Sequence, residues 1–315
     1  MGVGGWGANH VKTLSRLRAE GAIEDFIVID IDKDRLNYIS KLYGCRGYVS
    51  LDEALRKEDV EGLIIVTPTR LHFEHAKNAL ERGLHVLVEK PMTTTSSEAK
   101  ELIDIAKRNN RILMTGFLLR YSPAVQYLKE RLNDDPKYFG DPLLISVKRA
   151  NPGSIRRQDV GVIRDLTIHD VDLAMYLFGA KPIRAYAYVR REGYEFEVFA
   201  AGFVDYDSKY GKFTLLFEAS WIAPYKFRRW EISWTHKEVH LDLVSHKLQI
   251  YTGDEIIFKA PKGLDPLYIQ DRNFIRSMEG KEKPLVTGMD GFKALKICET
   301  LIKAANTGVP LDVSL

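Results

Sequence analysis

The chain opens with a glycine pattern that strongly constrains its fold. Gly2, Gly4 and Gly7 have the spacing G-x-G-x-x-G, with Gly5 and Trp6 inside the loop. This spacing makes a tight turn from a buried strand into a helix and lets the backbone approach a pyrophosphate. The helix that follows directs its free N–H groups and positive dipole end at the phosphates. Three glycines in six residues also occur in ordinary loops, so the next segments decide the fold.

Over the first 115 residues, continuous apolar runs typical of strands buried on both faces alternate with segments of helical spacing. The predicted strands are 26–29, 62–66, 85–88 and 112–114, and the predicted helices are 9–18, 52–55, 72–81 and 97–108. This alternation predicts a doubly wound parallel sheet, the Rossmann architecture. Ligands of such sheets bind at the carboxyl ends of the strands, where Gly2, Asp30, Thr67 and Lys90 all lie.

The first strand of this sheet, which would precede the glycine turn, is nearly missing from the sequence. The glycine turn needs a buried strand before it, yet only Met1 precedes Gly2. In the usual strand order this first strand lies between 26–29 and 62–66. Its loss would remove ladder hydrogen bonds from both neighbours and open a gap in the core. We therefore expect Met1 to be an internal methionine of the natural protein and the last residue of a truncated first strand.

Asp30 is the candidate residue for recognising the adenosine half of a dinucleotide. It follows the strand 26–29, and an acidic residue about 20 residues beyond the glycine turn takes the ribose hydroxyls in such folds. No arginine is directly adjacent to Asp30, so a ribose 2′-phosphate would be repelled and NAD is favoured over NADP. The alternative is that Asp30 only caps the next helix, and the sequence favours neither.

From about residue 141 the pattern changes to strands that alternate in period two. These are predicted at 143–148, 183–190, 196–206, 212–221, 227–235, 238–243, 247–251 and 255–259, with helices at 165–178, 265–278 and 289–306. Alternation predicts a large, mostly antiparallel open sheet with helices on one face. We therefore divide the chain into a Rossmann domain, 1–118, and an α+β domain, 119–315.

Aromatic residues of this sheet leave two alternatives open. They either fill the core between sheet and helices or pair the uncovered face with a second copy, giving a dimer or tetramer. The residues concerned are Phe199, Phe203, Phe217, Trp221, Trp230 and Trp234.

Composition narrows the functional classes. A net charge of +3 over 315 residues gives little support to nucleic-acid binding. No apolar run approaches the roughly 20 residues that span a bilayer, so we expect no membrane partner. Two cysteines, Cys45 and Cys298, offer neither a disulfide framework nor a metal-binding pattern, which indicates a cytoplasmic protein without a metal site.

Several segments, in this order, resemble the glucose–fructose oxidoreductase/inositol dehydrogenase (Gfo/Idh/MocA) family. They are 4–10 (GGWGANH), 67–69 with His72, 83–91 (GLHVLVEKP), 116–123, 165–172 (DLTIHDVD) and the closing helix from Asp290. The Glu-Lys-Pro after a strand, joined to Asp-x-x-x-His about 75 residues later, is far more specific than the glycine loop. The sequence departs from the family at Thr69, where Asn is common, and at Thr167, where Gly is frequent.

The resemblance implies oxidation of a secondary alcohol on a sugar or polyol, with hydride passing to nicotinamide. Such a reaction needs a group that takes the hydroxyl proton. The catalytic residues implied are Lys90 and His169, with Asp165 orienting the imidazole or binding a substrate hydroxyl. The implied cofactor-binding residues are Gly2, Gly4, Gly5, Trp6, Gly7, Asp30, Thr67, Pro68, His72, Glu89 and Lys90. We interpret His10, His75 and His85 as structural.

A basic segment, 148–164, precedes the motif helix. It either binds an anionic substrate or is an exposed, solvated loop, and the sequence favours neither. The implied substrate-binding residues are Lys90, Arg120, Tyr121, Arg156, Arg157, Asp165 and His169. The run from Arg156 to Ile163 is most similar to family members that oxidise the 3-hydroxyl of a UDP-N-acetylamino sugar. An inositol or simple-sugar dehydrogenase is the alternative within the same chemistry. A non-catalytic NAD-binding regulator is the alternative in another class, although it would have no need for Lys90, Asp165 and His169 together.

Overall fold

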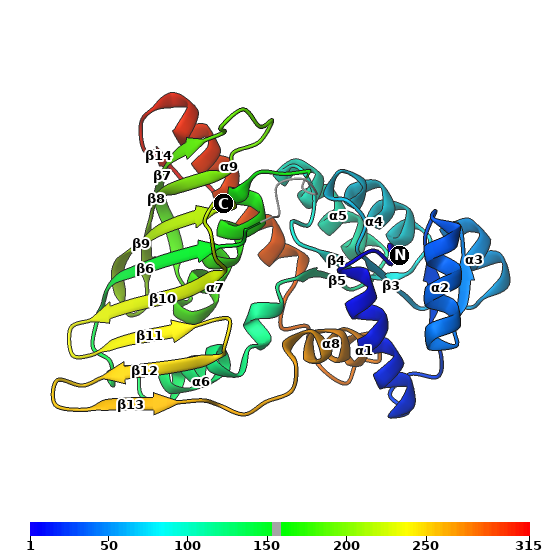
Figure 1. The fold of residues 1–315 in the computed structure, drawn as a ribbon, viewed down its shortest axis with the longest axis horizontal. Coiled ribbons are helices and arrows are strands. Elements are labelled where there is room, and N and C mark those ends of the chain that lie inside the picture. The colour runs from blue at the N-terminus through cyan, green and yellow to red at the C-terminus, as the bar shows by residue number, and fades with distance from the viewer. Residues whose placement is uncertain (153–158) are drawn as a thin grey trace. The chain divides into compact units, whose positions relative to one another are not determined.

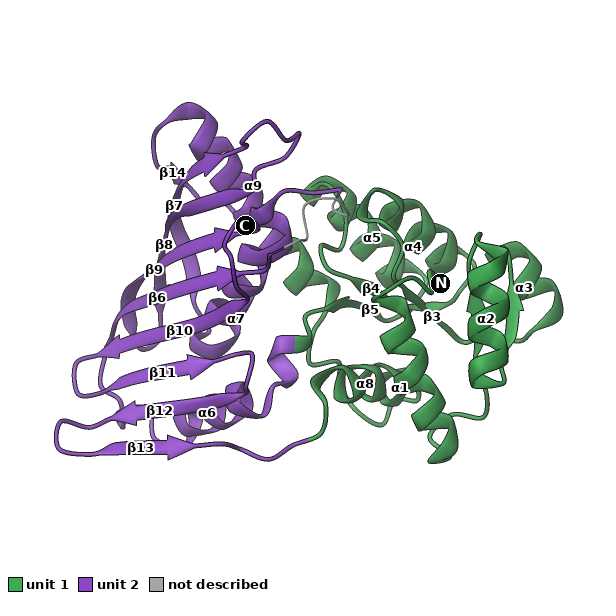
Figure 2. Ribbon diagram, viewed as in Figure 1, with its two compact units in different colours: residues 1–118, 264–292 green, residues 119–263, 293–315 purple. Residues whose placement is uncertain are grey.

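The computed structural model describes residues 1–152 and 159–315, which form two compact units (Figure 2). Unit 1 comprises residues 1–118 and 264–292, and unit 2 comprises 119–263 and 293–315. No helix in the described ranges is long and apolar enough to cross a membrane.

Unit 1 consists of parallel strands connected by helices, as predicted (Figure 1). Its elements up to residue 118 are α1 (Gly7–Ala19), β1 (Ile27–Ile29), α2 (Lys33–Tyr43), β2 (Arg46–Tyr48), α3 (Leu51–Lys57), β3 (Gly62–Ile65), η1 (Thr69–Leu71), α4 (His72–Glu81), β4 (His85–Glu89), α5 (Ser96–Arg108) and β5 (Leu113–Gly116). β1 pairs with β2, and β3, β4 and β5 form a three-stranded sheet, all in parallel.

Met1 and Gly2 lie between these two groups of strands. The Gly2 N–H donates to the Ile29 carbonyl at 2.8 Å, and the Val66 N–H donates to the Met1 carbonyl at 2.9 Å. The amino nitrogen of Met1 donates to the Ile64 carbonyl at 2.7 Å. The residues before the glycine turn therefore pair with β1 on one side and with β3 on the other, which is the central position predicted for the first strand.

The predicted domain boundary is wrong for one segment, residues 264–292, which we assigned to the second domain. Its helix α8 (Pro266–Met278) packs in unit 1 instead. Tyr268 and Ile275 of α8 form a buried apolar cluster with Leu17 of α1. Burial of this apolar face, rather than order along the chain, decides the unit to which α8 belongs.

Unit 2 is built on a nine-stranded sheet with the order β13-β12-β11-β10-β6-β9-β8-β7-β14. Its strands are β6 (Pro142–Ala150), β7 (Lys181–Arg190), β8 (Phe199–Ser208), β9 (Gly211–Ser220), β10 (Phe227–Trp234), β11 (Glu238–Asp242), β12 (Lys247–Tyr251), β13 (Ile256–Lys259) and β14 (Leu311–Asp312). Among the described strand pairs of this nine-stranded sheet, β6–β9 is parallel and the others are antiparallel. The predicted open, mostly antiparallel sheet is confirmed.

Helices cover one face of this sheet. The helical elements are η2 (Leu118–Tyr121), α6 (Pro123–Asp134), the π-helical turn η4 (Ile163–Thr167), α7 (Ile168–Phe178) and α9 (Gly288–Thr307), which begins in unit 1. Phe178 of α7 packs against Phe213 and Trp234, with ring centroids 4.8 and 6.0 Å apart. Of the six aromatic residues left open above, Phe217, Trp221, Trp230 and Trp234 are buried, whereas Phe199 and Phe203 are partly exposed.

Candidate functional site

The glycine turn has the geometry that a bound diphosphate requires. Gly2 adopts a φ of +83°, and a Cβ there would lie 2.8 Å from the Val66 carbonyl oxygen. A Cβ on Gly7 would lie 1.9 Å from the Gly2 oxygen, so only glycine lets α1 begin directly against the turn. By contrast, among residues 1–152 and 159–315, a Cβ on Gly5 would meet no atom within 4 Å, and one on Gly4 would meet only Arg35, at 4.0 Å. The backbone of Gly4 and Gly5 is thus open to a ligand at the start of α1.

Asp30 lies at the end of β1, against the glycine turn. Its two carboxylate oxygens accept hydrogen bonds from the backbone N–H groups of Val3, at 2.8 Å, and Asp32, at 2.9 Å. The alternative that Asp30 caps the next helix is wrong, because Asp32 is the N-cap of α2 and accepts from the Arg35 N–H. Asp30 therefore has the position, beside the glycine turn, at which an acidic residue meets the adenosine ribose.

Arg35 is a neighbour of Asp30 that the sequence analysis missed. Its guanidinium lies 3.4 Å from the Asp30 carboxylate and 2.9 Å from that of Asp32. Residue 35 is not adjacent to Asp30 in the sequence, but the first turn of α2 brings it back to the end of β1. Two carboxylates still outnumber one guanidinium at this position, which agrees with NAD rather than its 2′-phosphorylated form.

His72 joins two turns that follow neighbouring strands. Its Nε2 lies 2.7 Å from the Thr67 carbonyl oxygen, and its Nδ1 lies 2.9 Å from the Pro91 carbonyl oxygen. The ring is buried at 2% exposure, and the Lys90–Pro91 peptide bond is cis. Both ring nitrogens thus face backbone carbonyls, and the contact of His72 with the cofactor stays a prediction. His72 fixes the turn after β3 to the turn that carries Lys90.

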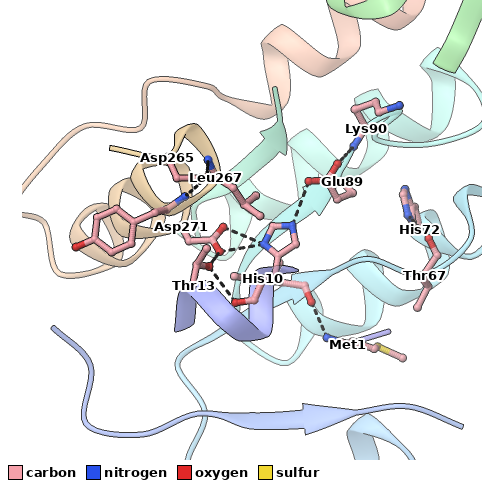
Figure 3. Close-up of polar contacts among 12 residues, drawn as sticks. Met1, His10, Thr13, Thr67, His72, Glu89, Lys90, Asp265, Leu267 and Asp271 are labelled. Carbon is pink, nitrogen blue, oxygen red and sulfur yellow. Dashed lines mark hydrogen bonds and ion pairs between the residues drawn. The ribbon is translucent and has the colours of Figure 1, made fainter. Parts of the chain in front are cut away.

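His10 is the centre of a buried charged network, although we had interpreted it only as structural (Figure 3). Its Nδ1 lies 3.0 Å from both carboxylate oxygens of Asp271 in α8, and its Nε2 lies 3.2 Å from Glu89 Oε1 at the end of β4. The hydroxyl of Thr13 also donates to Asp271. The second oxygen of Glu89 accepts from the backbone N–H of Lys90 at 3.2 Å. The network thus reaches the residue next to the candidate catalytic lysine.

The electrostatics of this network favour a charged histidine between two charged carboxylates. Burial alone would lower the pKa of His10, but Asp271 and Glu89 outweigh it and raise that pKa to about 10. Burial alone would raise the pKa of Glu89, but hydrogen bonds from His10 and Trp6, together with the Lys90 charge, hold it below its ordinary value. At neutral pH the Glu89 carboxylate is therefore ionised although it is buried.

In unit 2, Asp165 and His169 lie at the start of the motif helix, as predicted. Residues 163–167 form a π-helical turn and α7 begins at Ile168, so the pair spans a change of helix type. Such π-helical turns are frequent at functional sites. Both side chains are buried, and Asp165 Oδ2 accepts a hydrogen bond from Trp221 Nε1 at 3.0 Å. Trp221, 56 residues away in sequence, is a member of this site that the sequence analysis did not identify.

Two further aspartates of α7 are held by arginines. Arg149 from β6 binds Asp170 through Nε and Nη2, and Trp230 Nε1 donates to the same carboxylate at 2.9 Å. Arg120 binds Asp172 through Nε, at 3.0 Å, and through Nη2, at 2.6 Å. All four charged side chains of the two pairs are buried. These bidentate ion pairs fix α7 to β6 and η2.

The remaining predicted substrate residues have different outcomes. The guanidinium of Arg120 binds Asp172 and so holds α7. Its contact with substrate stays a prediction. Tyr121 is buried in η2. Arg156 and Arg157 lie outside the described residues.

These features define an NAD-binding Rossmann protein of two domains. Unit 1 has a glycine turn open to a diphosphate, an acidic residue at the end of β1 and a Lys-Pro turn after β4, and unit 2 is built on an open sheet. The family follows from the sequence. The chain belongs to the Gfo/Idh/MocA oxidoreductases: residues 1–117 match the model described as oxidoreductase family, NAD-binding Rossmann fold, and residues 126–240 match the C-terminal domain model of the same family.

Two characterised relatives show how far the likeness extends. UDP-N-acetylglucosamine 3-dehydrogenase of Acidithiobacillus ferrooxidans is 34% identical over 183 residues, 58% of this chain and 54% of the relative. The aligned part of the chain thus spans about half the length of that relative. A solved structure of this enzyme superposes with a TM-score of 0.86 at 27% identity, covering 97% of this chain and 96% of the other. Myo-inositol 2-dehydrogenase of Thermotoga maritima is 25% identical over 94% of this chain and 92% of its own.

Proposed function

We propose that this protein oxidises a secondary hydroxyl group of a sugar, with NAD as the acceptor of the hydride. The observation that carries the proposal is a pair of buried side chains, Asp165 on the π-helical turn and His169 in the first turn of α7, in a chain that also has Lys90 directly after β4. His169 takes the hydroxyl proton, and Lys90 polarises the oxygen of the forming carbonyl. Asp165, held by Trp221, orients the imidazole or binds a substrate hydroxyl.

The cofactor is held by unit 1 in this proposal. The open backbone at Gly4 and Gly5 receives the diphosphate, with Gly2, Trp6 and Gly7 shaping the loop. Asp30 takes the adenosine ribose. The nicotinamide half lies along the residues that follow β3 and β4: Thr67, Pro68, Glu89 and Lys90. NAD supplies the hydride-accepting carbon, and the residues named here position it.

We propose the 3-hydroxyl of a UDP-N-acetylamino sugar, such as UDP-N-acetylglucosamine, as the substrate. The support is the similarity to UDP-N-acetylglucosamine 3-dehydrogenase in sequence and in fold. Arg156 and Arg157 would bind the diphosphate of such a substrate. A specific observation also favours an inositol as the substrate. The similarity to myo-inositol 2-dehydrogenase extends over 94% of the chain, whereas the similarity to UDP-N-acetylglucosamine 3-dehydrogenase extends over 58%.

Reduction of NAD, followed by absorbance, tests these alternatives with UDP-N-acetylglucosamine, myo-inositol and free glucose as substrates. We expect turnover with the nucleotide sugar. Turnover with inositol or glucose but not with the nucleotide sugar would contradict the substrate assignment.

Lys90→Ala and His169→Ala test the catalytic roles. Each variant should bind NAD nearly as the wild type does and lose at least about a hundredfold in kcat, since positioned proton transfer contributes on the order of 10²–10⁴-fold. Unchanged turnover in either variant would refute the role of that residue.

Self-association belongs to the same proposal. On the face of the sheet that α7 leaves uncovered, the rings of Tyr186 and Phe203 lie 6.2 Å apart beside the exposed Leu216 and Tyr188. We propose that a second copy covers this face in the cytoplasm, giving a dimer or tetramer. Light scattering of the purified protein measures its mass in solution. A mass of two or four chains would support the proposal, and the mass of one chain would contradict it.

A further inference from the structure

The network around His10 joins segments that are far apart in the sequence. Trp6 and His10 belong to the glycine turn and α1, Glu89 and Lys90 end β4, and Asp271 is in α8, 261 residues beyond His10. In Figure 3, His10 lies between Asp271 and Glu89, and the side chain of Lys90 extends away from them. One buried imidazole thus connects the predicted cofactor loop, the predicted catalytic strand end and a helix that brings no predicted site residue.

The absence of a side chain at Gly116 leaves room for the Glu89 carboxylate. A Cβ on Gly116, at the end of β5, would lie 2.6 Å from Glu89 Oε1 and 2.7 Å from the carboxyl carbon. The carboxylate therefore occupies the space that any side chain at position 116 would need. With His10 on one oxygen and the Lys90 N–H on the other, the Glu89 carboxylate is held from three sides.

Packing alone does not account for these charges. Burial of an ion pair costs desolvation free energy that its attraction often fails to repay, and apolar residues of similar volume stabilise a core as well or better. An apolar cluster of Leu17, Tyr268 and Ile275 already packs α8 on α1. The charged groups concentrate instead at the end of β4, where Glu89 precedes Lys90.

We propose that Glu89, His10 and Asp271 are positioning residues for Lys90 in the reaction proposed above, on which this inference rests. His10, anchored by Asp271, fixes the Glu89 carboxylate, and that carboxylate fixes the main chain of Lys90 through its N–H. The ammonium group is thereby presented in one orientation relative to the glycine turn that begins α1. The three residues act as one unit, because His10 is the link through which Asp271 reaches Glu89.

Glu89→Gln, Asp271→Asn and the double variant test this arrangement, because each keeps side-chain size and removes one charge. Each single variant should lose about tenfold or more in kcat, since small displacements of a reacting group are costly. In Asp271→Asn, which changes no residue of the proposed cofactor site, KM and the Kd for NAD should change by less than about threefold. The double variant should be no slower than the slower single variant. Independent, multiplying losses would overturn the proposal.

Leu102→Ala is the matched control, because Leu102 is fully buried in α5 and belongs to unit 1 but not to the network. Below its own melting temperature this variant should keep the wild-type kcat. If Leu102→Ala lowers kcat as much as Glu89→Gln does, the network acts only through stability and the proposal fails.

A second readout needs no turnover and so separates this inference from the proposed reaction. Hydrogen exchange of the Lys90 amide should accelerate about tenfold or more in Glu89→Gln and in Asp271→Asn, but not in Leu102→Ala. The glutamine keeps one acceptor oxygen for two donors, His10 and the Lys90 N–H, and Asp271→Asn releases His10 and with it the Glu89 carboxylate. If no substrate is found for the wild type, this exchange still tests the arrangement. Unchanged exchange in Asp271→Asn would overturn it, whatever the activity.

Discussion

The two units hold their buried carboxylates in different ways. On α7 in unit 2, Asp170 and Asp172 each have an arginine of their own, bound through two nitrogens. In unit 1, Glu89 and Asp271 share one histidine. An arginine keeps its charge at any pH that the protein encounters, whereas an imidazole can lose it. The difference shows that α7 is fixed independently of pH, while the connection next to Lys90 depends on a proton.

Breaking one arginine pair should have the largest effect on stability. Arg149→Met leaves the buried Asp170 carboxylate without its cation, and we expect the free energy of unfolding to fall by about 3–5 kcal/mol. Urea denaturation followed by tryptophan fluorescence measures this loss, because Trp230 donates to the same carboxylate. Arg149→Met combined with Asp170→Leu is the control: it removes both charges and should recover most of the loss. A double variant as unstable as the single one would contradict the interpretation.

Titration of His10 should have the next largest effect. Its pKa is raised from 6.5 to about 10, so its stabilisation is complete below pH 6.5 and is lost as pH rises through about 10. Between pH 7 and pH 9 the folded state holds a proton that the unfolded state lacks. We expect a fall of about 2 kcal/mol in the free energy of unfolding over this range, because a full proton contributes about 1.4 kcal/mol per pH unit.

His10→Gln is the comparison for this pH dependence, since glutamine donates a hydrogen bond but does not titrate. Urea unfolding of both proteins at several pH values isolates the histidine from other groups that titrate in this range, such as Lys129, whose pKa burial lowers to about 8. The variant should be less stable at pH 7 and lack the decline. A parallel decline in both proteins would assign it to another group.

The smallest expected effect concerns the hydrogen bond from Trp221 to Asp165. Trp221→Phe removes the Nε1 donor, and we expect a loss of about 1.5 kcal/mol, the lower end of the range of about 1.5–3 kcal/mol for a hydrogen bond to a charged group. If Asp165 orients His169, kcat should also fall while the Kd for NAD is kept. Trp234→Phe is the matched control, because Trp234 is buried on the same sheet and contacts Phe178 instead. Equal losses of kcat in both variants would argue against a role for Trp221.

Local patterns predicted most of the fold. The helix 72–81 was placed to the residue, and β3 and β4 within one residue, because apolar runs and stop signals act over a few positions. α2 and β2 were missed, since α2 is mostly polar and β2 has only three residues, two of them exposed. The sequence nevertheless contains the two signals that mark the ends of α2, the N-cap Asp32 and the left-handed Gly44.

The site could be predicted only in part. Motif residues such as Asp165 and His169 are recognisable because their spacing is local. Their partners are not: Trp221 lies 56 residues from Asp165, and Asp271 lies 261 residues from His10. Contacts over such separations are decided by tertiary packing, and no period or cap in one sequence indicates them. Asp30 shows the same limit at short range, because Arg35 reaches it only once α2 is formed.

The return of residues 264–292 to unit 1 has a consequence for biosynthesis. Residues 1–118 leave the ribosome before the rest of unit 1, and Asp271 follows about 150 residues later, which takes on the order of 10–30 s at typical rates of translation. Until then α1 lacks the apolar face of α8, and His10 lacks one of its two counter-charges. Unit 1 therefore completes its folding only after residues 119–263 of unit 2 have been synthesised, and a nascent chain stalled in unit 2 would expose Leu17 to chaperones.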